Sequence, residues 1–545
     1  MFPWWVLLSA FHAPESYYRV KYPVPMTADW SVLLNTLLLA MLVLACLRMA
    51  FYSRRGSYAR AAAGILLILV SAYAIAKDWL LVLKVTDEQW GLFGGEGYRL
   101  LVWGAGVLVV AHFAAKDGAR AIRVLPNVLL VFLPILALNV MSVVLRSVVL
   151  PRSEPPIALV ETEGPPPELP GKLVWIVFDE LSENALNTVL DRGIELKEFR
   201  RFRTDSIVLG GSRSPSIWTI EAIPSLTTGL AVCRAEPRSG KSLSLHLDGR
   251  TEAVQWESLP SIFEKAVEAG RRVGLVGWVH PYCRMFGDKT TSCYWEESPF
   301  ASFGGWFHYF EKIGVLETAL QQLVQLVDAA SDRTQHDERR FHVGGEQTWK
   351  SLRGERLELL HRILETSERT LRDDRLGFVF LHLPVPHPPG FSPDAPHYED
   401  SAGYLGNLAL ADQALGQVRT ALEEEGLWED STVILTSDHG LRQFWRTTPF
   451  WSPEEESYFA PLDDRDVPLM IKMSNQNGAL NFDAALSTTI IYDFSIEILN
   501  GRITDVPSAR RWLETNYDDY PPACLTGESS SHLEGANYTP NSPKS

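Results

Sequence analysis

The sequence predicts an α/β protein in which an N-terminal bundle of transmembrane helices precedes a domain with a central, mostly parallel sheet. Two observations support this prediction. Residues 1–150 are apolar and basic, with 13 Lys and Arg against 7 Asp and Glu, whereas the 545-residue chain has a net charge of −16. The remainder therefore carries −22, and in it short apolar runs alternate with helical stretches, a pattern typical of βα units.

The N-terminal part contains four long apolar stretches, and each approaches or exceeds the roughly 20 residues that cross a bilayer. The loops near 52–60 and 116–124 are basic and the loop near 85–98 is acidic. Because basic loops stay in the cytoplasm, we expect a multi-pass protein of the cell (inner) membrane with everything after residue 150 in the periplasm or outside the cell. The lipid bilayer is then a partner. The stretches are 30–51, 61–83, 99–115 and 125–150.

Composition divides the chain into four parts. We expect transmembrane helices in 1–150, a Pro- and Glu-rich linker in 151–171, a folded domain in 172–524 and a disordered polar tail in 525–545. The acidic balance of the folded domain argues against nucleic-acid binding, because phosphates are neutralised by Lys and Arg.

The cysteines after residue 150 are even in number, which permits disulfides in an oxidising compartment. Cys283 and Cys293 close a short loop (CRMFGDKTTSC) and form the best candidate pair.

Five buried strands and four helices are expected in the folded domain. The strands are 172–178, 272–277, 377–383, 432–437 and 467–473, and the helices are 182–191, 258–269, 350–370 and 404–425. A further short element is expected from Pro224 to Gly229, because Pro favours a first helical turn and Gly a helix end.

Polar residues follow three of these strands closely. Asp179 and Glu180 follow the first strand, His387 follows the third, and Asp438 and His439 follow the fourth. Ligands in open α/β sheets bind beyond the carboxyl ends of strands, so these side chains indicate a divalent-metal site. Asp179 taken alone leaves another interpretation open, since Asp often caps a following helix.

A candidate nucleophile, Thr219, lies in the segment SRSPSIWTIEAIPSLTTGL. A hydroxyl is a weak nucleophile at neutral pH, and coordination to a divalent cation activates it. The backbone N–H groups of a nearby helix start can hold an anionic phosphoryl or sulfuryl group. On this segment alone, an ordinary Ser/Thr-rich loop is the simpler interpretation.

In combination, these residues resemble the alkaline phosphatase/sulfatase superfamily over roughly 172–500. The closest likeness is to its membrane-anchored branch of phosphoethanolamine transferases and lipoteichoic-acid-synthase-like enzymes. Thr219 stands five residues before a Pro and ten before a Gly, as the nucleophile of that family does. The stretch TSDHG is similar to the last metal motif of the family and LHLPVPHPP to its substrate-contacting segment, while Asp412 matches a structural position.

The resemblance implies a metal-dependent hydrolase or transferase that acts on phosphoesters, with a lipid-linked donor as one option. Asp179, Thr219, Asp438 and His439 would hold one divalent ion, Zn, Mn, Mg or Ca. Thr219 would attack phosphorus, and His387 would position the donor or act as general acid.

The sequence departs from the family pattern in two places. The C/S-x-P-S-R signature that sulfatases convert to formylglycine is absent, although Ser214-Pro215-Ser216 is reminiscent of it. A second His soon after the DHG is also absent, and Arg442 and Arg446 stand there instead; Arg suits phosphate or sulfate recognition. A sulfuric ester hydrolase and a non-catalytic binding or sensing protein on the same fold therefore stay open. His280 and Glu180 are weaker site candidates.

Overall fold

The structure, a computed structural model, describes residues 171–297, 345–388, 403–443, 453–459 and 463–520, together with Tyr18, Leu34 and Gly390. The contacts divide the chain into two compact units, and unit 2 holds every described residue except Leu34. Unit 2 consists of Pro14–Lys21, Glu154–Gly305 and Gln335–Ser545.

The localisation predicted from the sequence requires correction. No helix in the described ranges is both long enough and apolar enough to cross a bilayer, which contradicts the assignment to a multi-pass protein of the inner membrane with its folded domain in the periplasm or outside the cell. The two longest described helices, α15 (Gly345–Arg372) and α16 (Tyr404–Glu424), carry charged residues along their length. The four apolar stretches that motivated the prediction lie outside the described residues.

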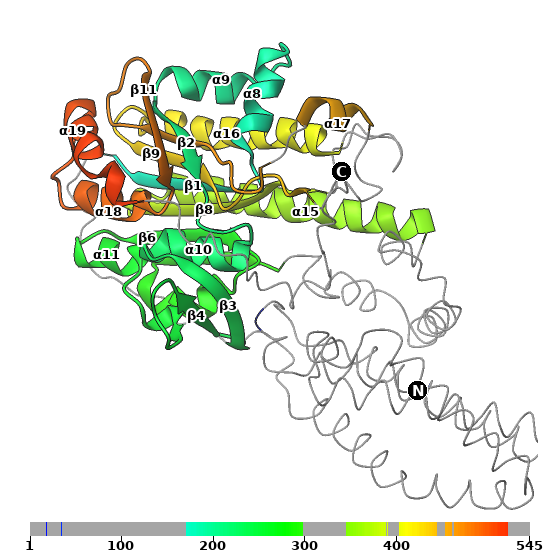
Figure 1. The fold of residues 1–545 in the computed structure, drawn as a ribbon, viewed down its shortest axis with the longest axis horizontal. Helices are drawn as coiled ribbons and strands as arrows, with labels where there is room; N and C mark the ends of the chain where they lie inside the picture. The colour runs from blue at the N-terminus through cyan, green and yellow to red at the C-terminus, as the bar shows by residue number, and fades with distance from the viewer. Residues whose placement is uncertain are drawn as a thin grey trace, which may run out of the picture. The chain divides into compact units, whose positions relative to one another are not determined.

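A central eight-stranded sheet organises the described part of unit 2 (Figure 1). In spatial order its strands are β11 (Leu480–Ser487), β2 (Ile207–Arg213), β10 (Leu469–Lys472), β9 (Thr432–Ser437), β1 (Leu173–Asp179), β8 (Phe378–Pro386), β6 (Val273–Trp278) and β7 (Ser292–Glu296). The run from β9 to β7 is parallel throughout, and β10 is antiparallel to both β9 and β2. The expected central, mostly parallel sheet is therefore confirmed.

Strand β1 lies at the middle of this sheet and is buried along its whole length. Its side chains alternate between two cores, as the period of a strand requires. Ile176 and Phe178 enter one core, which also contains buried residues of α8, α9, α15 and α16, while Trp175 and Val177 enter the other, with α10, α11 and α18. A strand covered on both faces reads as a continuous apolar run, which is why LVWIVF was recognisable in the sequence.

Helices cover both faces of the sheet (Figure 1). The four expected helices are present with shifted ends, as α8, α11, α15 and α16. The short element expected from Pro224 is instead the second half of a longer helix, α10, which begins five residues earlier at Thr219 and ends before Gly229 in the left-handed region. The remaining helix bounds are α8 (Glu183–Asp191), α9 (Lys197–Thr204), α10 (Thr219–Thr228), α11 (Ile262–Glu268), α12 (Tyr282–Phe286), α17 (Pro453–Phe459), α18 (Ile490–Leu499) and α19 (Val506–Asn516).

A small antiparallel sheet, β3 (Val232–Ser239), β4 (Ser242–Leu247) and β5 (Val254–Gln255), lies between α10 and α11 in the chain. The predicted disulfide between Cys283 and Cys293 is present, with Cα atoms 5.7 Å apart, and it joins α12 to β7. This disulfide restrains the segment that follows β6.

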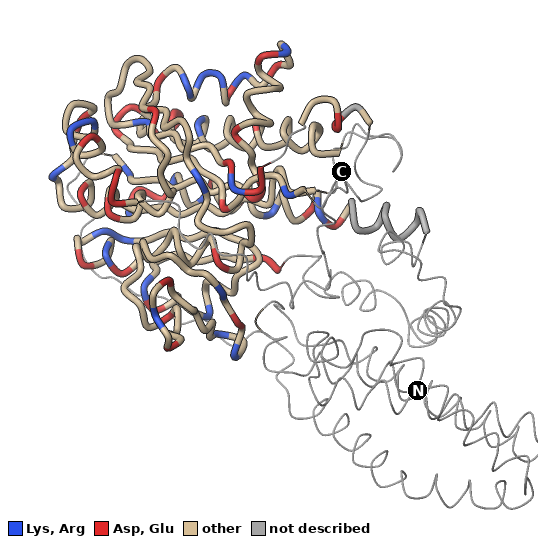
Figure 2. Tube along the Cα trace, viewed as in Figure 1, with Lys and Arg blue, Asp and Glu red and all other residues tan. Residues whose placement is uncertain are grey.

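Basic residues concentrate on α9, as Figure 2 shows. This helix lines a surface cavity of about 600 Å³ whose walls include Lys197, Arg200 and Arg201. None of the predicted site residues lines that cavity, so the chemistry suggested by the sequence belongs elsewhere.

Candidate metal and nucleophile site

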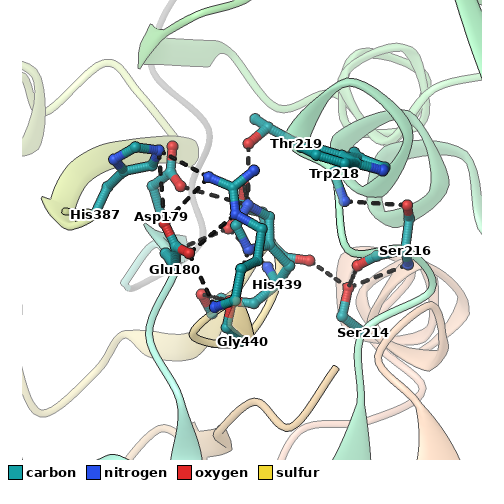
Figure 3. A network of polar contacts seen from close by, with 12 residues as sticks. Asp179, Glu180, Ser214, Ser216, Trp218, Thr219, His387, His439 and Gly440 are labelled. Carbon is teal, nitrogen blue, oxygen red and sulfur yellow. Dashed lines mark hydrogen bonds and ion pairs between the residues drawn. The ribbon is translucent and has the colours of Figure 1, made fainter. Parts of the chain in front are cut away.

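The predicted metal ligands gather at the carboxyl edge of the sheet, where the paired strands β1 and β9 end. Figure 3 shows Asp179 and His439 among the polar residues at this edge. Asp179 is the last residue of β1, and Asp438 and His439 follow β9 directly. Their ligand atoms all lie within 4.8 Å of one another, and all three side chains are buried. Neighbouring parallel strands bring together residues that are more than 250 positions apart in sequence.

The oxygen atoms of this cluster fit a bound cation. Asp179 Oδ1 and Asp438 Oδ2 are buried and have no hydrogen-bond partner among the described residues. They lie 3.7 and 3.6 Å from His439 Nε2. Buried polar atoms are nearly always hydrogen-bonded, so two unsatisfied carboxylate oxygens facing an imidazole nitrogen indicate a site for a divalent cation.

Hydrogen bonds fix the orientation of the other ligand atoms. Asp438 Oδ1 accepts the backbone N–H groups of Glu180 at 3.0 Å and His439 at 2.7 Å, which leaves Oδ2 facing the cluster. His439 Nδ1 lies 2.9 Å from the Gly440 carbonyl. Because a carbonyl only accepts, Nδ1 carries the proton and Nε2 presents a lone pair, which is the tautomer that binds metals.

The two carboxyls repel one another when no cation is present. Burial raises the pKa of Asp179 well above its usual range, and the neighbouring Asp438 raises it further. Burial also raises the pKa of Asp438 to about 6, against the opposing influence of the Thr219 hydroxyl and two backbone N–H groups. A divalent cation would relieve this repulsion and hold both groups ionised.

Thr219 is the first residue of α10 and lies at the rim of this cluster (Figure 3). Its Oγ1 atom is 3.4 Å from His439 Nε2. No side chain caps the N-terminus of α10, whose preceding residue, Trp218, has extended backbone. The threonine hydroxyl and the positive end of a ten-residue helix are therefore presented at the same place.

Ser214 and Ser216, which resemble part of a sulfatase signature, have structural partners instead. The Ser214 hydroxyl donates to the Asp438 carbonyl, and the Ser216 hydroxyl donates to Glu221 at 2.5 Å. Ser216 Oγ also accepts the backbone N–H of Trp218 at 3.1 Å. Both hydroxyls shape the turn that leads into Thr219.

Glu180 binds an arginine, although its oxygens also lie within 4.8 Å of ligand atoms of Asp179 and His387. Arg442 Nε donates to Glu180 Oε1 at 3.0 Å, and Nη2 donates to Oε2 at 3.2 Å. The Glu180 backbone has φ +68°, a left-handed conformation that is costly for a residue with a β-carbon. The Arg442 guanidinium also lies 5.0 Å from the centre of the Trp218 ring.

His387 contacts this ion pair and is the acceptor in the contact. Arg442 Nη2 lies 3.1 Å from His387 Nε2, and arginine always donates. His387 Nδ1 donates in turn to the Pro388 carbonyl. Burial, together with Arg442 and Arg356, lowers the pKa of His387 well below its usual range, so the imidazole is neutral. This arrangement does not favour the general-acid role expected from the sequence.

Three further residues were singled out in the sequence, namely Asp412, His280 and Arg446. Asp412 accepts the backbone N–H of Phe199 at 2.8 Å, which confirms its structural role. His280 does reach the site, with Nε2 3.1 Å from the Thr219 carbonyl. Arg446 lies outside the described residues.

Two residues near the site carried no recognisable signal in the sequence. Arg356 of α15 is buried and donates to the His387 carbonyl at 2.8 Å. The Tyr18 hydroxyl lies 2.8 Å from His280 Nδ1, across a separation of 262 residues. An Arg in a largely polar helix and a Tyr in a polar segment look like ordinary surface residues until the fold is known.

Comparisons with known proteins give one family match and several similar solved structures. A family model described as Sulfatase matches residues 278–492. No curated protein sequence matches the chain. Among solved structures, the chain is similar to a protein in the alkaline phosphatase superfamily from Vibrio parahaemolyticus (14% identity, 61% of this chain and 67% of that chain covered, TM-score 0.37). It is also similar to the PsFucS1 sulfatase from Pseudoalteromonas sp. (14%, 62% and 69%, 0.35) and to phosphonate monoester hydrolase of Agrobacterium radiobacter (16%, 60% and 73%, 0.34).

The family match covers His387, Asp438 and His439, together with the strands β8 and β9 that position them. The finer likeness to a membrane-anchored branch is not supported by these matches. The expected likeness to the sulfatase family is confirmed by this match of residues 278–492 to the Sulfatase model.

Proposed function

We propose that the protein is a metal-dependent hydrolase of phosphate monoesters or diesters that uses Thr219 as nucleophile. The observation that carries this proposal is the cluster of Asp179, Asp438 and His439, in which one oxygen of each carboxylate is buried and has no hydrogen-bond partner among the described residues. The Thr219 hydroxyl lies 3.4 Å from the His439 imidazole. The lipid-linked donor expected from the sequence depended on a membrane location and is not part of the proposal.

The residues that would hold the cation are Asp179, Asp438, His439 and Thr219. When bound, a divalent cation supplies positive charge that lowers the pKa of the hydroxyl and neutralises charge developing on the ester oxygens. Two carboxylates, one imidazole and one hydroxyl suit Zn, Mn, Mg or Ca to different degrees.

The Thr219 hydroxyl loses its proton to solvent as Oγ1 attacks the phosphorus, an O–P bond forms, and the bond to the leaving alkoxide breaks. The alkoxide takes a proton from solvent. Water then cleaves the threonine ester and restores the hydroxyl, releasing phosphate from a monoester or the remaining phosphate monoester from a diester. The N-terminus of α10 favours the negative charge of the transferred group at this point.

Arg442 supplies a fixed positive charge beside this centre. Glu180 and His387 hold its guanidinium from two directions, at 3.0–3.2 Å. In our proposal His387 is therefore a positioning residue that accepts a hydrogen bond from Arg442, and the general-acid role is dropped. Arg442 attracts the anionic ester and limits how it is oriented.

Sulfate-ester hydrolysis is the alternative that the family match favours. The serines that could supply an oxidised nucleophile are instead hydrogen-bonded in the turn before α10. Transfer to an acceptor other than water would use the same first step, so it differs only in what attacks the threonine ester.

Variants at Thr219 test the proposal directly. We expect Thr219→Ala to lose at least about 100-fold in turnover of p-nitrophenyl phosphate, because the covalent step is removed, and Thr219→Ser to retain most of it. Mass spectrometry of the 212–230 peptide after a rapid acid quench should show one added phosphoryl group on Thr219. Full turnover by Thr219→Ala would refute the scheme, and turnover of p-nitrophenyl sulfate alone would favour the sulfatase alternative.

A further inference from the structure

A buried histidine connects the nucleophile to a residue near the beginning of the chain. His280 is fully buried, and its Nε2 atom lies 3.1 Å from the backbone carbonyl oxygen of Thr219. Its Nδ1 atom lies 2.8 Å from the hydroxyl of Tyr18, which is 1% exposed. Tyr18 belongs to the same compact unit as the α/β domain, although more than 150 residues separate it from β1.

The direction of both hydrogen bonds follows from the chemistry of the partners. The Thr219 carbonyl only accepts, so His280 Nε2 carries a proton and donates. In a neutral imidazole Nδ1 is then an acceptor, and the Tyr18 hydroxyl donates to it. The order is therefore Tyr18 O–H to His280 Nδ1, and His280 Nε2–H to the Thr219 carbonyl. Loss of the Tyr18 hydroxyl would leave a buried lone pair and remove the bond that selects this tautomer.

Packing holds the imidazole ring in place. The Trp256 ring lies 5.0 Å from the His280 ring in a T-shaped arrangement, and its indole N–H donates to Thr227 Oγ1 at 3.2 Å. Thr227 lies near the end of α10, whereas Thr219 begins it. Val279, which precedes His280, has φ +69° and so turns the chain sharply after β6. The helix that presents the nucleophile is thus held at its first turn by His280 and at its last by Trp256.

We propose that His280 and Tyr18 form a positioning pair for Thr219, so that the Tyr18 side chain completes the nucleophile site. This inference rests on the proposed function, because it assigns a role to contacts with the proposed nucleophile. His280 fixes the peptide group of Thr219, and that peptide fixes the distance of Oγ1 from His439. A displacement of about 1 Å in such a group lowers the rate far more than it changes substrate binding.

The structure offers a matched control. Tyr282 and His382 form a second buried pair, with the Tyr282 hydroxyl 2.9 Å from His382 Nδ1. The pair has no hydrogen bond to Thr219 among the described residues. Tyr282→Phe therefore removes the same kind of bond at the same burial. It keeps the aromatic ring, which lies 5.5 Å from the His280 ring, so it should leave the position of the nucleophile unchanged.

The experiment measures kcat, KM and bound zinc per chain for the full-length zinc-loaded protein with p-nitrophenyl phosphate as substrate. We expect Tyr18→Phe and His280→Phe to lower kcat about tenfold with KM within about twofold of wild type and zinc content unchanged. Tyr282→Phe should keep the wild-type kcat. His280→Gln retains an N–H donor for the Thr219 carbonyl and should recover most of the rate. Tyr18→Phe should have no further effect in the His280→Phe background, because the pair acts as a unit.

Two results would overturn the inference. One is wild-type kcat in Tyr18→Phe and His280→Phe while Thr219→Ala is inactive, which leaves the proposed function standing. The other is an equal loss of kcat in Tyr18→Phe and Tyr282→Phe, which would show a general effect of buried Tyr–His pairs. Full activity of Thr219→Ala would instead refute the proposed function itself. If His280→Phe does not fold, the comparison of Tyr18→Phe, Tyr282→Phe and His280→Gln decides the question.

Discussion

Asp179 and Asp438 show how single residues determine the behaviour of the site. Each carboxyl has a raised pKa because it is buried, and each has an oxygen without a hydrogen-bond partner in the described part of the chain. Removing one carboxylate therefore has opposite effects on the metal-free and metal-bound protein, since it relieves repulsion in the first and deletes a ligand in the second.

The first prediction concerns Asp438→Asn. Without metal, we expect this variant to be more stable than wild type by about 1–3 kcal/mol at pH 7.5, because a buried charge is removed. With saturating Zn²⁺ the order should reverse, and activity should fall at least about 100-fold. Urea unfolding with and without EDTA measures both effects. Asp374→Asn, at an exposed position, is the control, and an identical stability change in the two states would contradict the assignment of Asp438 as a ligand.

The ion pair between Glu180 and Arg442 gives a second prediction at this scale. Arg442→Met should destabilise the protein by about 3–5 kcal/mol, because it removes the guanidinium that neutralises the buried Glu180 carboxylate. Adding Glu180→Gln should restore most of the stability but not the activity, if the guanidinium attracts the ester. Chemical denaturation and turnover of p-nitrophenyl phosphate separate the two contributions, and full recovery of turnover in the double variant would exclude a role for Arg442 in substrate binding.

At the scale of elements, strand β10 is joined to the segment before β9 by a buried lysine. Lys472 is 1% exposed, and its ammonium donates to the carbonyls of Trp428, Glu429 and Ser431. Burial lowers the pKa of Lys472 to about 8. These bonds connect the antiparallel strand to the parallel part of the sheet, next to β9, the strand that Asp438 follows.

This lysine predicts a specific pH dependence of stability. Because its folded-state pKa is lowered, the unfolded chain binds more protons between about pH 8 and the unfolded value of 10.5, and stability rises with pH across this window. The cost of burying the charged form is fully present below about pH 8. Urea midpoints at pH 7.5 and 9.5 should show the increase in wild type and a smaller one in Lys472→Met. Equal slopes in the two proteins would rule out Lys472 as the source.

The disulfide between α12 and β7 gives the last prediction. Its loop spans ten residues, and closing a loop of this size stabilises a fold by about 2–3 kcal/mol. Cys283→Ala combined with Cys293→Ala should lower the unfolding free energy by this amount and leave KM unchanged. A loss of metal binding in the double variant would show that the loop supports the site directly.

For the whole molecule, the sheet and the site residues could be predicted from the sequence, whereas the hydrogen bonds and ion pairs around the site could not. Parallel strands buried on both faces are uniform apolar runs, so β1, β8 and β9 could be located, and their carboxyl ends placed Asp179, His387, Asp438 and His439 together. The start of α10 was misplaced because Pro224 was interpreted as a first-turn residue, whereas Thr219 begins the helix. The predicted location in the inner membrane was wrong, because no described helix is both long enough and apolar enough to cross a bilayer.

The missed partners share one physical cause. Glu180 with Arg442 and Tyr18 with His280 are pairs separated by 262 residues in both cases, and neither member shows a local pattern. A periodicity reports which face of an element is buried, but it does not report which distant side chain satisfies a buried polar atom. Such partners can be identified only once the three-dimensional structure is known, and here they lie beside the proposed metal and nucleophile site.

Asp179 belongs at once to the cluster with Asp438 and His439 and to the cluster with Glu180 and His387. The same carboxylate thus belongs to the predicted ion site and feels the charge of the Arg442 guanidinium, which lowers the pKa of Asp179 against the effect of burial. Filling or emptying the ion site must then change the electric field at that arginine. The nitrogen-15 resonance of Arg442 Nε should accordingly titrate with added metal, giving a spectroscopic gauge of occupancy that needs neither substrate nor dye.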